Sequence, residues 1–223
     1  MTLTALTWIL LGPAVAAPGA AKIQAVLHDD AGWNHDGNKD GVTIYTKPMP
    51  GSELSAWKGV RIASVDAGVL WTLICDVGNH DQVSDMLHET RVLARTGDRT
   101  DYYQVSKSPR FVPVSERYWV NYARVSLDMG GTPGHHRRTW NSIEDTAPYA
   151  SVIDGILTRY PDAIRLAATH GSWEIRPLPD GKVEITYRTF SDPGGAVPSS
   201  VMDYLSGRSL PNNILQFEEA AKR

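Results

Sequence analysis

The stretch Asp192-Pro193-Gly194-Gly195-Ala196-Val197-Pro198 decides the fold, because it separates a strand from the last helix of the chain. Pro193 fixes φ and the two glycines can take the positive φ of a sharp reversal, so a β-strand must end here. Beyond it, apolar residues recur every three or four positions almost to Arg223, which predicts a long amphipathic helix, kinked or split around Gly207 and Pro211. Its apolar positions are Val201, Leu205, Ile214, Phe217 and Ala221.

Most of the chain between residue 41 and this turn has the pattern of β-strands. In the last strand, Val183, Ile185 and Tyr187 alternate with polar residues, which is typical of a sheet with one solvated face. Short helices are predicted over 68–75 and 81–87, and only strands after them. Short turns between consecutive strands indicate an antiparallel meander that the C-terminal helix covers. We expect strands at 41–46, 57–65, 91–95, 101–107, 116–127, 137–144, 164–176 and 182–190.

The composition fits one globular domain and gives no sign of nucleic-acid binding. The chain has 223 residues, of which 42% are hydrophobic, and a net charge of −3 from 22 basic and 25 acidic side chains. That content can bury one large core. The basic residues are dispersed, so nucleic acid is not an expected partner. The one basic cluster, His135-His136-Arg137-Arg138, is interpreted as the solvated start of a strand.

The first residues resemble an export signal. Residues 3–11 are nearly all apolar, and Ala14-Val15-Ala16 offers the small residues that signal peptidase requires. The first four residues lack the usual positive charge. The sequence therefore predicts a signal peptide at 1–16, a mature domain at 17–223, and a periplasmic or secreted protein. Cys75 is the only cysteine, so no internal disulfide can form, and its apolar neighbours favour a buried structural thiol.

One local pattern suggests calcium. Asp36-x-Asn38-x-Asp40-Gly41 matches the first half of an EF-hand loop, but Lys47 occupies the position of the bidentate Glu. The flanking residues also favour strands over helices. A polar turn before a strand explains the pattern, so we expect no metal site.

The order of elements resembles that of the START family, the steroidogenic-acute-regulatory-related lipid-transfer domains, from about residue 33 to the C-terminus. The resemblance implies an α+β helix-grip fold, in which a curved antiparallel sheet wraps around a long C-terminal helix, with two short helices between the early strands. The turn at 192–198 looks like the start of the family's lid helix, particularly in its phosphatidylcholine-transfer branch. The other matching stretches are Ser55-Ala56-Trp57-Lys58-Gly59-Val60, Tyr102-Tyr103-Gln104-Val105 and Ser115-Glu116-Arg117-Tyr118-Trp119-Val120.

The resemblance implies a tunnel between sheet and helix that holds one lipid-like molecule. If Trp119 faces inward, as the corresponding family aromatic does, strand alternation places Arg117, Asn121 and Ala123 beside it. For each such residue, packing in the core is the alternative role. The predicted ligand-binding residues are Tyr103, Val105, Arg117, Trp119, Asn121, Ala123 and Thr169 on the strands, with Val201, Met202 and Leu205 on the helix.

The departures from the phosphatidylcholine branch leave the ligand open. His80 stands near the position of that branch's phosphate-binding Arg, and Thr169 replaces one aromatic of its choline cage, of which Tyr103 and Trp119 would preserve a part. A sterol, a fatty acid or another hydrophobic molecule fits equally well.

The function expected from these features is non-enzymatic binding and transport of a hydrophobic molecule by a monomer, with transient contact to a membrane surface. We assign no catalytic residue and no cofactor, because no known catalytic spacing occurs among the acidic and histidine residues. Two alternatives remain open, because a fold does not determine function. One is a helix-grip enzyme such as a cyclase, and the other is a lipid sensor.

Overall fold

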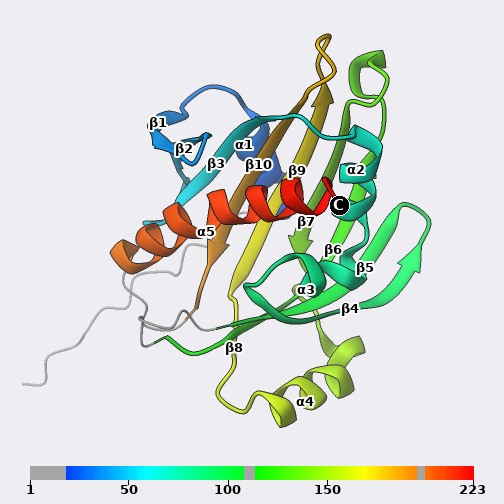
Figure 1. The fold of residues 1–223 in the computed structure, drawn as a ribbon. Helices are drawn as coiled ribbons and strands as arrows, with labels where there is room; N and C mark the ends of the chain where they lie inside the picture. Colours follow the sequence, from blue (N-terminus) through cyan, green and yellow to red (C-terminus); the bar gives the residue numbers. More distant parts are fainter. Residues whose placement is uncertain (1–18, 108–113, 195–198) are drawn as a thin grey trace, which may run out of the picture.

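The computed structural model describes residues 19–107, 114–194 and 199–223, with the backbone alone for 199–206 and 208. A single curved sheet of ten strands dominates this part of the chain, and the C-terminal helix α5 crosses one of its faces (Figure 1). The expected α+β helix-grip architecture is confirmed. The predicted signal peptide at 1–16 lies outside the described residues.

The sheet has the strand order β1-β2-β3-β10-β9-β7-β6-β5-β4, and β8 pairs with β6 off this path. Neighbouring strands along the path are antiparallel, as expected, whereas β8 and β6 are parallel. The strands are β1 Asn34–Lys39, β2 Val42–Pro48, β3 Ser55–Ala63, β4 Leu87–Thr96, β5 Arg99–Ser106, β6 Arg117–Ser126, β7 His136–Ser142, β8 Ile164–Arg165, β9 Ala168–Pro177 and β10 Val183–Asp192.

Five α-helices surround this sheet in the described residues. The expected helix at 68–75 is α2, but the one at 81–87 is shorter, because Leu87 already begins β4. The strand expected at 164–176 is two strands, β8 and β9. The helices are α1 Ala20–His28, α2 Ala67–Cys75, α3 His80–Val83, α4 Ala150–Arg159 and α5 Ser199–Ala220.

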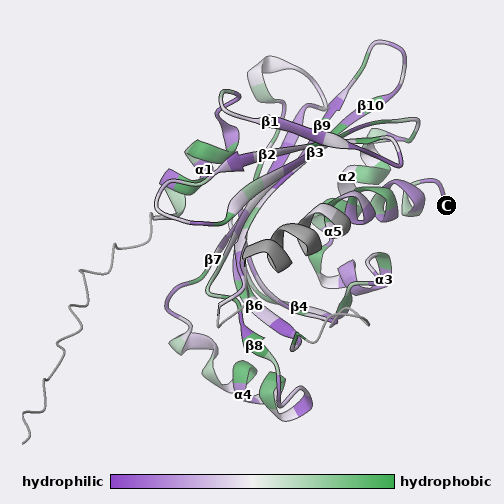
Figure 2. Ribbon diagram, turned by 90° about the vertical axis from the view of Figure 1, so that its left-hand side faces the viewer, coloured by the Kyte–Doolittle hydropathy of each residue, from purple (hydrophilic) through white to green (hydrophobic). Residues whose placement is uncertain are grey.

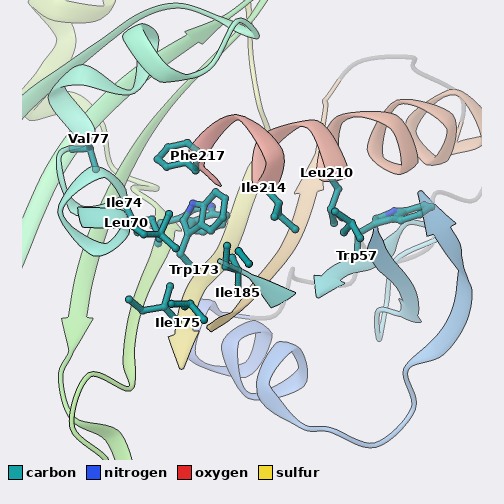
Figure 3. Packing of buried hydrophobic residues seen from close by; sticks show 14 of the residues in the cluster. Trp57, Leu70, Ile74, Val77, Trp173, Ile175, Ile185, Leu210, Ile214 and Phe217 are labelled. Atoms are coloured by element: carbon teal, nitrogen blue, oxygen red, sulfur yellow. The ribbon is translucent and has the colours of Figure 1, made fainter. Parts of the chain in front are cut away.

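The helix α5 packs tightly on β3, and a glycine makes this possible. A Cβ atom added to Gly59 would lie 2.7 Å from Cδ1 of Ile214 and would also overlap Leu210. Leu210, Ile214 and Phe217 of α5 join the largest hydrophobic cluster (Figure 3). Full burial of such a side chain contributes about 1.5–3 kcal/mol, so three of them offset a proline inside a helix, which costs about 3 kcal/mol.

Consistent with that balance, α5 runs through Pro211 as one helix of 22 residues. A split, one of the two outcomes expected for the C-terminal helix around Gly207 and Pro211, is therefore wrong. In an α-helix, the ring of a proline crowds the carbonyl four residues earlier, which for Pro211 belongs to Gly207. Gly207 itself lies against the ring of Trp57 on β3, where an added Cβ atom would be 3.4 Å away.

The opposite face of the sheet carries two helices that the sequence analysis did not predict. Ile23 and Leu27 of α1 cluster with Phe190 of β10, and Ile156 of α4 clusters with Tyr103 of β5. Figure 2 shows α1 on the side of the sheet away from α5. The expectation of strands alone between residue 87 and the turn at 192–198 is therefore wrong, because α4 lies there. We call the α5 side of the sheet the inner face and the other side the outer face.

The residues that resemble half an EF-hand form the β1–β2 turn. Asp40 and Gly41 both have positive φ, 53° and 78°, and the side-chain oxygen of Asn38 accepts a hydrogen bond of 3.2 Å from the Gly41 N–H. Within the described residues, no three His, Cys, Asp or Glu side chains are grouped to hold a metal. Among the same residues, no helix has the length and apolar character needed to cross a membrane.

Candidate functional site

Trp119 lies on the inner face, as predicted, and a chain of contacts joins it to α5. Its indole N–H donates a hydrogen bond of 3.0 Å to Oε1 of Gln104 on β5, and Nε2 of Gln104 lies 3.3 Å from Nδ1 of His80. The His80 ring meets Phe217 of α5 edge-on, with ring centroids 5.0 Å apart. Trp119 is only partly buried, although it faces the covered side of the sheet.

His80 is neutral in this chain of contacts. Its Nε2 donates to the carbonyl oxygen of Ile74 at 3.2 Å, so Nδ1 accepts the hydrogen bond from the Gln104 amide. Burial, together with the positive charge of Arg138, lowers the pKa of His80 to about 3. With both ring nitrogens engaged, His80 is poorly suited to general acid–base catalysis near neutral pH.

Asn121 carries the clearest sign of a missing partner. It lies on the inner face of β6, opposite Tyr102 of β5 and Ser142 of β7, and its exposed fraction is 0%. Neither its side-chain oxygen nor its nitrogen has a hydrogen-bond partner among the described residues. Each unsatisfied buried polar group costs about 1–3 kcal/mol, so this position is suited to a polar group from outside the chain.

Arg138 is a second buried polar residue on the inner face. Its exposed fraction is 3%, and its guanidinium lies over the Tyr102 ring at 5.2 Å from the centroid. Its Nη2 atom has no hydrogen-bond partner in the described part of the chain. The interpretation of residues 135–138 as a solvated strand start is therefore wrong for Arg138, which shares a strand face with the buried Trp140.

A row of aromatic rings extends the inner face toward α5. Trp140 stacks on Tyr187 at 5.4 Å, Tyr187 meets Trp173 at 4.5 Å, and Trp173 meets Phe217 of α5 at 4.9 Å. Gly171 of β9 leaves the space for the first ring, because an added Cβ atom would overlap the Trp140 indole. This row makes the surface beside Asn121 and Arg138 strongly apolar.

The other predicted inner-face residues on the strands have structural contacts. Oγ1 of Thr169 accepts hydrogen bonds from the Trp140 indole at 3.3 Å and from Ser191 at 3.1 Å, which fixes the orientation of that indole. Arg117 donates at 3.1 Å to the carbonyl oxygen of Pro193, where the turn before α5 begins. Ala123 belongs to the main hydrophobic cluster.

Tyr103 and Val105 lie on the outer face, so their predicted place beneath the C-terminal helix is wrong. In the β5–β6 register, Gln104 pairs with Trp119, and Tyr103 and Val105 therefore point to the other side, where they pack with Ile156 of α4. The hydroxyl of Tyr103 donates to Glu89 at 3.1 Å. The inner-face residues of β5 are Tyr102 and Gln104. The side chains of Val201, Met202 and Leu205 lie outside the described residues.

Four inner-face residues were not predicted, and the sequence pattern contained enough information to place only some of them. Trp119 was correctly placed, but the face of β5 depends on its register with β6, which the sequence does not determine. Arg138 was expected to be solvated like its basic neighbours, although its spacing of two from Trp140 predicts that both residues lie on the same strand face. The missed residues are Tyr102, Gln104, Arg138 and Trp140.

Comparison with known proteins identifies the architecture. The human StAR-related lipid transfer protein 5 superposes with a TM-score of 0.75 at 18% identity, covering 91% of this chain and 92% of that one. A STAR-related lipid transfer protein from Xanthomonas axonopodis gives 0.71 at 19% identity, covering 86% and 99%. The chain has the START fold. An aromatase/cyclase from Streptomyces shares the START-like architecture less closely, with a TM-score of 0.51 at 11% identity over 75% of this chain and 93% of that one.

Sequence comparison adds little to the fold. No protein-family model matches the chain. An uncharacterized protein of Pseudomonas aeruginosa is 26% identical over 191 residues, which cover 86% of this chain and 87% of that protein. The inner face combines apolar side chains with two buried polar ones, Asn121 and Arg138, of which the Asn121 amide and Nη2 of Arg138 lack hydrogen-bond partners among the described residues. The chemistry of this surface suits a molecule with an apolar body and a polar group.

Proposed function

We propose that this protein binds one hydrophobic or amphiphilic molecule between the inner face and α5, and carries it through water between membranes. The observation that carries the proposal is Asn121, whose buried amide has no partner on either side-chain atom in the part of the chain that the structure describes. Ligand sites in proteins combine an apolar lining with a few polar groups that fix the orientation of the ligand. The START fold supports the proposal, because two solved structures with TM-scores of 0.71 and 0.75 to this chain are named as lipid-transfer proteins.

The candidate ligands are sterols, fatty acids and phospholipids. A buried lipid gains about 25 cal/mol for each Å² of apolar surface removed from water, so about 300 Å² contributes about 7 kcal/mol. A choline cage finds less support, because Tyr103 and Trp119 face opposite sides of the sheet. Selective binding of phosphatidylcholine is therefore not part of the proposal.

The proposed place of action is outside the cytoplasm. The apolar segment at 3–11 and the small residues Ala14 and Ala16 support export of a monomeric carrier. In that compartment, a soluble carrier would move lipid across the aqueous space between membranes. Contact with a membrane would depend on apolar side chains more than on anionic lipid, because the net charge of the chain is −3.

Native mass spectrometry of the purified protein, before and after solvent extraction, tests this function. We expect one apolar adduct that extraction removes, and rebinding of at least one member of a panel of sterols, fatty acids and phospholipids. An Asn121→Leu variant should shift selectivity toward ligands with fewer polar groups, and an outer-face Thr139→Val variant should leave it unchanged. Absence of any adduct and of any binding across the panel would contradict the proposal.

Two further outcomes separate the alternatives. Transfer of the bound molecule from donor to acceptor liposomes supports a carrier, whereas binding without transfer supports a lipid sensor. A chemically converted product in the extract, in place of the added molecule, would instead indicate an enzyme.

A further inference from the structure

Arg138 is a buried cation without a counterion among the described residues. Its Nη2 atom has no hydrogen-bond partner there, and its exposed fraction is 3%. Its guanidinium contacts the Tyr102 ring, and a cation–π contact contributes about 2 kcal/mol when desolvated. An effective penalty of several kcal/mol for burying a charge is not offset by that contact alone.

Other arginines of this protein show what a paired guanidinium looks like. On the same strand, Arg137 points to the outer face and donates to Glu174 at 3.0 Å. Arg188 of β10 donates to the same carboxylate at 2.9 Å, and Arg61 of β3 donates to Glu218 of α5 at 2.9 Å. Arg137 and Arg138 are adjacent in sequence, but only Arg137 has a carboxylate partner among the described residues.

The titratable groups whose charge is coupled to Arg138 do not neutralise it. His80 is neutral at pH 7, because burial lowers its pKa to about 3. Burial raises the pKa of the Cys75 thiol to about 11 and raises the pKa of Tyr187 well above its ordinary value, so neither is an anion at neutral pH. Within the described residues, these groups therefore supply no negative charge to Arg138.

We propose that Arg138 receives a single anionic group, a carboxylate or a phosphate, at the head of an amphiphilic ligand. This inference rests on the proposed function and names the ligand class for the same site. A guanidinium presents planar, paired N–H donors that match carboxylate and phosphate oxygens. Asn121 is suited to bind the same head group. It pairs with Tyr102 across β5 and β6, and the Arg138 guanidinium lies over the Tyr102 ring.

The experiment compares ligands that differ only in the head group. Hexadecanoate, hexadecyl phosphate and hexadecanol are titrated into delipidated protein at pH 8, with inorganic phosphate as a fourth probe. We expect the two anions to bind about 10- to 100-fold more tightly than the alcohol, which is the range for a hydrogen bond to a charged group. The anion that binds more tightly shows whether the preferred head group is a carboxylate or a phosphate.

Three variants test the role of Arg138. Arg138→Met should abolish the preference, so that the two anions bind no more tightly than the alcohol, and Arg138→Lys should retain part of the preference. Arg176→Met removes an exposed arginine that pairs with Glu184, and should preserve the wild-type preference. Without ligand, Arg138→Met should also unfold at a higher temperature than the wild type, because it removes a buried unpaired charge.

The outcomes separate this inference from the proposed function. Equal affinity for acid and alcohol in the wild-type protein would overturn the role of Arg138 and leave lipid binding intact, even if the Met variant does not fold. Binding of none of the four probes would count against both. If inorganic phosphate binds as tightly as hexadecyl phosphate, the proposal of an amphiphilic ligand is overturned, and the site is one for free phosphate. A lower melting temperature for ligand-free Arg138→Met would indicate a structural arginine.

Discussion

The indole N–H of Trp119 donates a hydrogen bond of 3.0 Å to the side-chain oxygen of Gln104, across the β5–β6 strand pair. This bond holds a partly buried indole in a defined orientation on the inner face. Because the amide nitrogen of Gln104 also contacts His80, the two strands and the segment around α3 share one polar link.

Replacement of Gln104 tests this link. In Gln104→Leu, the indole N–H and Nδ1 of His80 both lose their partner, and each unsatisfied buried group costs about 1–3 kcal/mol. We expect a lower urea midpoint, followed by circular dichroism, and weaker binding of every ligand because Trp119 is no longer fixed. A control, Thr139→Val on the outer face, should bind like the wild type. Unchanged stability of Gln104→Leu would show that the link is not made in solution.

Acid should destabilise the protein through His80. Its pKa is about 3 in the folded protein and close to 6.5 when unfolded, so between these values the unfolded chain binds a proton that the folded chain does not. Stability should therefore rise with pH from about 3 to 6.5 and level off above that range. The slope of unfolding free energy against pH should be smaller in His80→Gln, and should not change in His35→Gln, an exposed residue on β1. A wild-type slope in His80→Gln would refute this role.

The contact between Gly59 and α5 predicts a specific loss of stability. An added methyl group would overlap Leu210 and lie 2.7 Å from Ile214, and such overpacking costs about 1–3 kcal/mol. Thermal unfolding of Gly59→Ala should show this decrease. The matched change Gly155→Ala in α4, whose new Cβ atom meets its nearest neighbour at 3.5 Å, should be neutral or stabilising. Equal melting temperatures for the two variants would show that α5 does not pack closely on β3.

The outer face should contribute to stability without affecting the ligand. Glu174 accepts hydrogen bonds from His135 at 2.8 Å, Arg137 at 3.0 Å and Arg188 at 2.9 Å. These contacts lower the pKa of Glu174 to about 2 although burial opposes them. Glu174→Gln should reduce stability by about 3–5 kcal/mol, because it leaves a buried Arg188 without its charge partner. Ligand affinity of the folded variant should not change, and a large loss of affinity would place the ligand on the outer face.

The sequence predicted the architecture better than the site. Alternation of Val183, Ile185 and Tyr187 identified the inner face of β10, since burial against α5 imposes a period of two. Placing Tyr103 required the register of β5 against β6, and a shift of one residue moves a side chain to the other face. Arg138 was misplaced because its basic neighbours suggested solvent, and charged residues are seldom buried without a partner.

The missed helices have a different explanation. Val152, Ile153 and Ile156 show the helical spacing of α4, but they lie between the strands expected at 137–144 and 164–176, where no helix was predicted. The resemblance to a known family began at residue 33, after the end of α1. At Pro211 the sequence suggested an interruption that the helix does not show as a split. The packing of Leu210 and Ile214 stabilises a helix that local propensity would divide.

The most direct measurement is a crystal structure of the protein with the molecule that solvent extraction recovers. The account predicts that this molecule lies between the inner face and α5, in contact with Trp119, and that a polar group of it is within hydrogen-bonding distance of Asn121. A ligand bound to Tyr103 and α4 on the outer face would contradict the account. So would an inner face filled by protein side chains, with Asn121 paired to one of them.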